Sequence, residues 1–113
     1  MQLKGPKNDS KYHWTEHSKF KMQFYGISSQ RALRVIRSPH RTETGIVEKT
    51  VAVMQPTSIK RGKDGKENWG SEIWVMYQIN RKIKIISVWR YPGVSPKNNP
   101  IPEDVLREIE NIV

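Results

Sequence analysis

IWVMYQINRKIKIISVWRY, at residues 73–91, is the segment that decides the fold of this chain. It predicts two strands, because it is rich in β-branched and aromatic residues. It also predicts a tight turn at Asn80 and Arg81, because Asn tolerates the left-handed backbone that such turns need. In this register the facing pairs are Val75 with Ile86, Ile73 with Val88, Met76 with Ile85, and Trp74 with Ser87. Both faces are then largely apolar, so we expect this hairpin at the centre of a sheet that other segments cover.

Two helices are expected before this hairpin. In HWTEHSKFKMQFYGIS, Thr15 is placed to cap the start of a helix of about three turns, and Gly26 lies just past its end. The second helix follows almost at once, with Ser28 or Ser29 as its N-cap, and Pro39 ends it. These segments predict a pair of helices that packs on the sheet.

Three further segments complete the expected fold. Alternation of apolar residues predicts a strand over 45–55, and the glycines and lysines of residues 56–70 predict a long basic hairpin tip. Residues 92–101 are rich in Pro and Asn and indicate an irregular linker, and residues 102–113 indicate a short helix with Pro102 at its first position. Residues 1–11 are typical of a flexible basic arm.

This order predicts a single α+β domain over residues 1–113. Consecutive strands with hairpin connections indicate an antiparallel sheet of three or more strands, with the two N-terminal helices on one face. The second face is left to the short C-terminal helix, to a partner, or to a ligand.

Composition limits the classes of function. The chain of 113 residues has no cysteine, which excludes thiolate zinc sites, thiol catalysis and disulfides. It lacks a phosphate-binding glycine loop and an H-E-x-x-H motif, and His13 and His17 have no evident third ligand, so we expect no cofactor and no metal. No apolar run is long enough to span a membrane, so we expect a cytoplasmic protein without membrane contact. The formal charge of +9 favours a polyanionic partner, with nucleic acid as the leading class.

A polar pair interrupts the expected apolar stripe of the first helix. On a helical wheel the broad face contains Trp14, His17, Phe20, Lys21, Phe24 and Tyr25. RNA cleavage by attack of a 2′-hydroxyl needs a proton acceptor, cations at the phosphate and a proton donor, but no metal. His17 suits proton transfer near neutral pH, and Lys21 and Arg90 suit phosphate binding. Tyr91 is a candidate for base stacking or for donating its hydroxyl. The alternative is structural, with His17 hydrogen-bonded in the core and the stem of Lys21 running along it.

Other bases and aromatics are candidates for binding nucleic acid. They are Arg31, Arg34, Arg37, Lys60, Arg61, Lys63, Lys84 and Tyr77. The three arginines recur every third residue of the second helix and form a basic ridge, although a solvated helix face would show the same pattern. The lysines of the hairpin tip concentrate charge on an exposed finger. In the register above, Tyr77, Lys84 and Arg90 point to one face of the sheet.

The stretch HSKFKMQFYGISSQRALRVIRSP, residues 17–39, resembles the opening segment of a known protein family. The pattern runs His-Ala-x-x-Arg-Met-x-x-Arg-Gly-Ile-Ser, followed by an amphipathic helix that ends near a proline. This pattern is typical of a domain-of-unknown-function family that is close to the RelE and BrnT toxin superfamily. The matching residues are His17, Met22, Gly26, Ile27, Ser28 and Pro39. Ser18 stands for the small Ala and Lys21 for the first Arg, whereas Tyr25 departs from the second Arg. The closing hairpin of the family is similar to residues 73–93.

The resemblance implies a RelE-like fold and a function on RNA. Related toxins cut RNA, often mRNA on the ribosome, until an antitoxin covers them. It therefore implies an RNA-binding protein of the toxin type, with metal-independent ribonuclease activity as the sharper hypothesis. Two alternatives stay open: a non-catalytic module whose apolar sheet face binds a partner or a second copy, and a protein that only binds nucleic acid.

Overall fold

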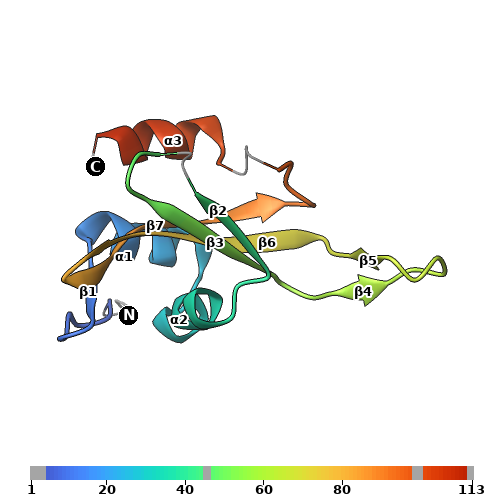
Figure 1. Cartoon of the computed structure of the whole chain (residues 1–113), viewed down its shortest axis with the longest axis horizontal. Helices are drawn as coiled ribbons and strands as arrows, with labels where there is room; N and C mark the ends of the chain where they lie inside the picture. Colours follow the sequence, from blue (N-terminus) through green and yellow to red (C-terminus); the bar gives the residue numbers. More distant parts are fainter. Residues whose placement is uncertain (1–4, 45–46, 98–100, 112–113) are drawn as a thin grey trace.

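The computed structural model describes residues 5–44, 47–97 and 101–111 of the chain. The elements, in chain order, are β1 (Tyr12–Trp14), α1 (Glu16–Tyr25), α2 (Ser29–Arg37), β2 (Arg41–Thr44), β3 (Val51–Pro56), β4 (Lys60–Arg61), β5 (Glu67–Asn68), β6 (Ser71–Asn80), β7 (Lys82–Pro92) and α3 (Glu103–Glu110). This is an α+β architecture, as predicted, in which helices lie on both sides of one main sheet (Figure 1).

The main sheet is mixed rather than purely antiparallel. Its strand order is β1-β7-β6-β3-β2, and β1 pairs with β7 in parallel, whereas the other neighbours are antiparallel. The two edge strands, β1 and β2, were not predicted. Three and four residues are too few for a periodic pattern, and Tyr12 pairs with Ile83, which is far along the chain. The expectation of an antiparallel sheet was therefore wrong at the β1 edge.

The central hairpin forms from β6 and β7, but its predicted register is wrong. At the turn only Arg81 lies outside the ladder, and it has a positive φ of 46°. The register also shifts between Met76 and Tyr77, where Ile86 is the extra residue of a β-bulge. Val75 therefore faces Val88. The observed pairs that replace the other predicted ones are Ile73 with Arg90, Trp74 with Trp89, Met76 with Ser87, and Tyr77 with Ile85. Relative to the predicted pairing, the turn shifts the register by one residue and the bulge by one more. A shift of two residues leaves each side chain beyond the bulge on its predicted face of the sheet, so both faces stay apolar.

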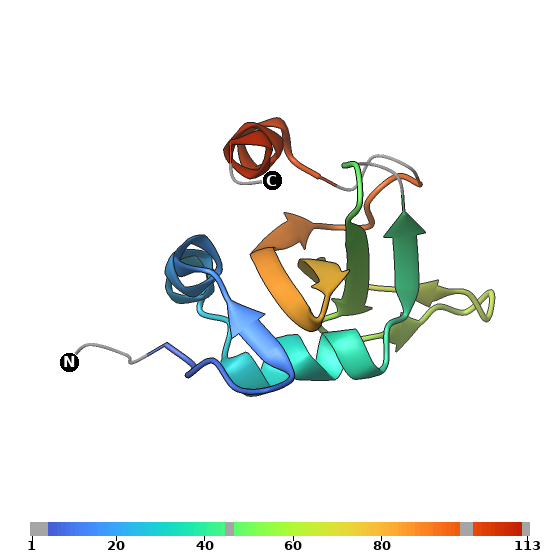
Figure 2. The ribbon, with the colours of Figure 1, turned by 60° about the vertical axis from the view of Figure 1, so that its left-hand side comes forward.

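Two hydrophobic cores lie on opposite faces of the sheet. The first joins β1, α1 and α2 to the sheet and contains Tyr12, Trp14, Met22, Ile27, Ala32, Val35, Val53, Ile73, Val75, Ile85 and Val88. The second joins α3 to the sheet and contains Ala52, Met54, Trp74, Met76, Ile86, Trp89, Ile101, Val105 and Ile109. Figure 2 shows α3 above the sheet and α2 below it. The C-terminal helix thus covers the second face in the same chain.

The ends of the two N-terminal helices follow the predicted signals. Thr15 Oγ1 accepts a hydrogen bond from Ser18 N at 3.1 Å, and Gly26 adopts the left-handed conformation with φ 65°. Ser28 Oγ accepts from Arg31 N at 3.0 Å, so Ser28 is the N-cap of α2. The sequence therefore sets where α1 and α2 begin and end.

The buried face of α1 differs from the predicted stripe. Phe20 and Phe24 are 61% and 67% exposed, whereas Ser18, Lys21 and Met22 are buried. Ser18 is fully buried where α1 packs against β7, and Phe20 and Phe24 lie on the other side of the helix. A ten-residue helix with apolar residues on several sides does not select one face by its own pattern.

The predicted strand over 45–55 begins later than expected. Its observed counterpart, β3, starts at Val51, and Val47–Thr50 form a turn in which Lys49 has φ 64° and Thr50 Oγ1 donates to Val47 O at 2.7 Å. Positions 45 and 46 lie outside the described residues. The alternation of apolar and polar residues continues through this turn, so the sequence pattern did not indicate it. Val47 fits the alternation because it is half-buried against the second core.

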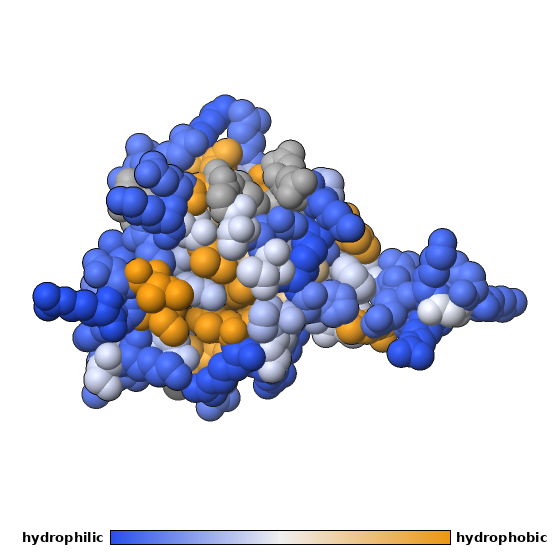
Figure 3. All heavy atoms as spheres, in the orientation of Figure 1, coloured by the Kyte–Doolittle hydropathy of each residue, from blue (hydrophilic) through white to orange (hydrophobic). Residues whose placement is uncertain are grey.

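The predicted basic finger is a separate two-stranded hairpin. It is formed by β4 and β5 and extends from the body of the molecule (Figure 1). Gly65 has φ 77°, as its turn requires, and Asp64 Oδ1 accepts from Lys66 N at 3.0 Å. In Figure 3 this projection is largely hydrophilic. None of the helices in the described ranges is long and apolar enough to cross a membrane.

Candidate nucleic-acid interface

His17 and Lys21 lie side by side on α1, as predicted, and both contact α3. Lys21 Nζ is 2.8 Å from Glu108 Oε2, and His17 Nε2 is 3.5 Å from the same oxygen. The Lys21 ammonium also lies 5.2 Å from the ring centre of Phe24 and 5.8 Å from that of Tyr25. The side chain of Lys21 is only 7% exposed. The pair therefore joins α1 to α3 through a carboxylate.

The electrostatic environment keeps His17 neutral. Burial lowers the pKa of the imidazole, the Glu108 carboxylate opposes this effect, and the Lys21 ammonium lowers the pKa further. The net pKa lies below the ordinary value of 6.5. At neutral pH the imidazole is therefore an uncharged group beside an ion pair.

Arg90 and Tyr91 have other partners. Arg90 Nε donates to Tyr25 O at 2.7 Å, and Arg90 Nη2 lies 3.5 Å from Gly26 O, so the guanidinium satisfies carbonyls at the end of α1. Tyr91 is the next residue of β7 and packs against the second core, on the opposite face of the sheet. Of the four predicted catalytic residues, His17 and Lys21 thus share Glu108, Lys21 and Arg90 both contact Tyr25, and Tyr91 lies on the opposite face of the sheet.

Tyr77 and Lys84 do not share a face, contrary to the predicted register. Tyr77 is opposite Ile85 and packs against the first core, and burial raises the pKa of its hydroxyl. Lys84 is opposite Gln78, one position along, and therefore points to the other side of the sheet. It lines a surface depression of about 440 Å³ near the β6–β7 turn, with His13, Asn80, Arg81 and Lys82. This turn and the basic finger lie at opposite ends of β6 (Figure 1).

The arginine ridge of α2 reaches the root of the finger. Arg31 Nη2 donates to Pro56 O at 3.1 Å, at the end of β3. Burial lowers the pKa of Arg31, and the positive charges of Arg34 and Arg90 lower it further. Arg37 is exposed in the last turn of α2. The ridge is therefore continuous with the start of the finger.

The finger adds four exposed cations to this end of the molecule. They are Lys60, Arg61, Lys63 and Lys66. Over the described ranges, no carboxylate lies within ion-pair distance of these cations. Their charge is therefore available to an anionic ligand.

Two surface depressions meet at the root of the finger and share Thr57 and Ser58. One has a volume of about 430 Å³ and is lined by Arg31, Ser38, Pro39, His40, Gln55, Pro56, Thr57, Ser58 and Ile59. The other has a volume of about 330 Å³ and is lined by Thr57, Ser58, Lys60, Asn68, Trp69 and Gly70. His40 and Trp69 were not predicted as site residues. The signal for Trp69 was its place directly after the basic tip, where an aromatic ring adjoins concentrated charge.

A buried carboxylate holds this region together. Glu72 is fully buried and accepts hydrogen bonds from Trp69 Nε1 and Trp74 Nε1, both at 2.8 Å, and from Ser95 N at 3.1 Å. Ser95 Oγ donates to it as well. Arg41 Nη1 donates to Ser95 O at 2.9 Å, which connects β2 to the same cluster.

These donors determine the ionisation of Glu72. Burial alone would raise its pKa, but the hydrogen bonds from Ser95, Trp69 and Trp74 outweigh burial and hold the pKa below the ordinary value of 4.5. The burial of Glu72 was not predicted. Trp69 and Trp74 are close to Glu72 in sequence, whereas Ser95 is 23 residues away and only the fold brings it to the carboxylate.

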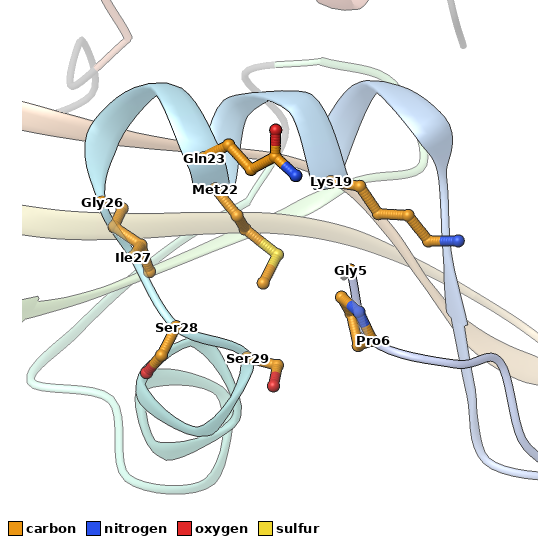
Figure 4. A pocket seen from close by; sticks show the side chains of 9 residues that line it. All are labelled: Gly5, Pro6, Lys19, Met22, Gln23, Gly26, Ile27, Ser28 and Ser29. Carbon is orange, nitrogen blue, oxygen red and sulfur yellow. The ribbon is translucent and has the colours of Figure 1, made fainter. Parts of the chain in front are cut away.

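A further cavity of about 300 Å³ lies between α1, the start of α2 and the N-terminal segment (Figure 4). Its lining is Gly5, Pro6, Lys19, Met22, Gln23, Gly26, Ile27, Ser28 and Ser29. None of the predicted site residues lines it, and among the described residues Lys19 is the one charged side chain in its lining. It is therefore a poorer candidate for binding a polyanion than the root of the finger.

Comparison of the chain with family models, with curated proteins and with solved structures gives no match. The resemblance to the RelE and BrnT superfamily therefore stays a prediction, whereas the α+β class is observed. Across the described part of the chain, no group of three or more His, Cys, Asp or Glu side chains is arranged to hold a metal ion.

Proposed function

We propose that this protein binds RNA through the basic finger and the arginine ridge of α2. The observation that carries the proposal is the set of exposed finger cations without carboxylate partners, joined to Arg31 at the root of the finger. Cations that neutralise phosphates release bound counterions, and this release drives association with nucleic acid. The resemblance to RNA-directed toxins favours RNA over DNA, and it likewise makes the ribosome and an antitoxin candidate partners.

RNA cleavage is a narrower proposal with weaker support. The adjacency of His17 and Lys21 favours it, because a neutral imidazole is the form that accepts a proton. However, the Glu108 carboxylate stands beside both groups, where it would repel a phosphate. The geometry therefore supports binding better than catalysis. A partner on the second sheet face is also less well supported, because α3 covers that face.

The test compares two variants that each lose four positive charges. The finger variant carries Lys60→Gln, Arg61→Gln, Lys63→Gln and Lys66→Gln. The control variant carries Lys11→Gln, Arg81→Gln, Lys82→Gln and Lys84→Gln, which lie around the opposite end of β6. Fluorescence anisotropy with a labelled RNA of about twenty nucleotides should show that the finger variant binds roughly tenfold more weakly, or worse, at low salt. The control variant should retain most of the affinity.

Equal losses in the two variants would mean that net charge alone attracts RNA, and would refute a localised interface. A wild-type protein that does not bind RNA at low salt would refute the proposed function itself. Incubation of RNA with the wild type and with His17→Ala tests cleavage separately. Product formed by the wild type and lost in His17→Ala would establish the ribonuclease.

A further inference from the structure

We propose that the root of the finger holds one unstacked base against Trp69, so that the protein selects single-stranded over double-stranded RNA. This inference rests on the proposed function and adds the class of RNA and the residue that recognises it. The base would occupy the 330 Å³ depression between the finger and β6, and the flanking phosphates would lie near Arg31 and Lys60.

Trp69 is suited to this role because it is both accessible and fixed. Trp14, Trp74 and Trp89 are at most 3% exposed, whereas Trp69 is only half-buried and forms one wall of the depression. Its indole N–H donates to Glu72 Oε2 at 2.8 Å, which holds the ring in one orientation. A preorganised aromatic ring loses little conformational freedom when a base stacks on it.

The neighbours of Trp69 match the other parts of a nucleotide. The His40 ring lies 5.1 Å from the Trp69 ring at an angle of 82°, and His40 and Ile59 are exposed in the adjoining depression. Ser58 and Asn68 place polar side chains in the walls, where the hydrogen-bonding edges of a base need them. A volume of about 330 Å³ lies within the usual range for small-ligand pockets, roughly 300–1,000 Å³.

The geometry favours a single strand for a physical reason. A duplex buries the faces of its bases and offers a protein its phosphates, sugars and groove edges. The finger cations suffice for phosphate contacts, whereas an accessible, oriented indole beside them adds affinity only if a base leaves its stack. A single strand presents such bases without the cost of opening base pairs.

The test uses Trp69→Leu, with Phe20→Leu as a matched control that removes an exposed aromatic ring from α1. A ten-nucleotide single strand of mixed sequence and a duplex of the same sequence are the probes. Trp69→Leu should weaken single-strand binding roughly tenfold and leave duplex binding nearly unchanged. Phe20→Leu should leave both unchanged.

A second measurement does not depend on a substitution. Because the other three tryptophans are buried, iodide quenches chiefly Trp69 in the wild type. Saturation with the single strand should protect that fluorescence from iodide, and the duplex should protect it much less. Equal protection by both RNAs, or an affinity of Trp69→Leu equal to that of the wild type, would overturn the base site and leave RNA binding intact. If neither RNA binds, the proposed function fails first.

Discussion

At the residue scale, Glu72 has a structural role that its position in the sequence does not indicate. A buried carboxylate is costly unless donors satisfy it, and here two indoles, one hydroxyl and one backbone amide do so. It links β6, the root of the finger and the segment that leads to α3. We therefore expect it to control stability and the position of Trp69 together.

Glu72→Gln should lower the free energy of unfolding by about 3 kcal/mol, because the amide nitrogen of Gln would face donors instead of accepting from them. Urea denaturation at pH 7 measures the loss. Glu67→Gln in the exposed finger is the control and should change stability by less than about 0.5 kcal/mol.

The same substitution predicts a dependence on pH. The folded-state pKa of Glu72 is lowered, so its contribution is complete above the unfolded pKa of about 4.5 and is lost as the pH falls through the lower folded value. The stability difference between the wild type and Glu72→Gln should therefore shrink below pH 4.5. A constant difference down to pH 2 would contradict this assignment.

His17 should titrate below pH 6.5, and its neighbours should move the midpoint in opposite directions. Lys21→Met removes a positive charge and should raise the pKa of His17, whereas Glu108→Gln removes a negative charge and should lower it. NMR titration of the imidazole carbon protons measures both shifts. Because the folded pKa is lowered, protonation favours the unfolded state, and stability should fall as the pH drops below 6.5. Shifts of the same sign in both variants would contradict the contact with Glu108.

At the scale of elements, α3 is part of the core. It has eight residues, and an isolated helix of this length is unstable in water, so its packing on the sheet must stabilise it. Val105 and Ile109 are fully buried in the second core, and Glu108 contacts α1. Removal of this helix would expose the Trp74 and Trp89 face of the sheet.

Ile109→Ala should therefore lower the free energy of unfolding by about 2–4 kcal/mol through lost packing and a new cavity. Arg107→Ala, on the exposed side of the same helix, should cost less than about 0.5 kcal/mol. Thermal and urea unfolding compare the two. Similar small losses in both variants would show that α3 contributes little to the folded state.

The end of α1 provides another test at this scale. Arg90 donates to carbonyls of the last turn of α1, so Arg90→Met should lower stability by about 1–2 kcal/mol. If its role is only to hold this helix end, RNA affinity measured below the unfolding transition should change little. A loss of RNA affinity comparable to that of the finger variant would instead place Arg90 in the interface.

At the scale of the whole molecule, we expect the positions of the cations to matter more for RNA binding than the net charge. Four of the cations lie on the finger, and another group of cations lies around the β6–β7 turn, at the opposite end of β6. The cations at the turn have a carboxylate nearby, since the charges of Lys82 and Lys11 help to lower the pKa of Asp9. Over the described ranges neither end forms an ion pair, and the finger also contains the carboxylates of Asp64 and Glu67, with Glu67 opposite Arg61 in the β4–β5 pair.

The dependence of RNA affinity on salt concentration should show which of the two groups of cations contacts phosphate. For a single strand, the slope of log affinity against log salt should become less steep by about 0.7 for each finger cation that contacts a phosphate and is replaced. The variant of the opposite end should keep the wild-type slope. Identical slopes in all three proteins would assign the salt dependence to the general field of the molecule.

By itself, the sequence determined the local structure: Thr15 as the cap of α1, Ser28 or Ser29 as the cap of α2, the left-handed Gly26, the basic finger, and a central hairpin with two apolar faces. These features follow from propensity and periodicity, which act over a few residues. Only the tertiary structure decided the bulge at Ile86, the burial of Lys21 instead of Phe20, and the parallel edge strand β1. It also decided the contact of Ser95 with Glu72 and the contact of Arg90 with the end of α1. Each of these depends on contacts between segments distant in the chain, where packing and the burial of charge outweigh local preference.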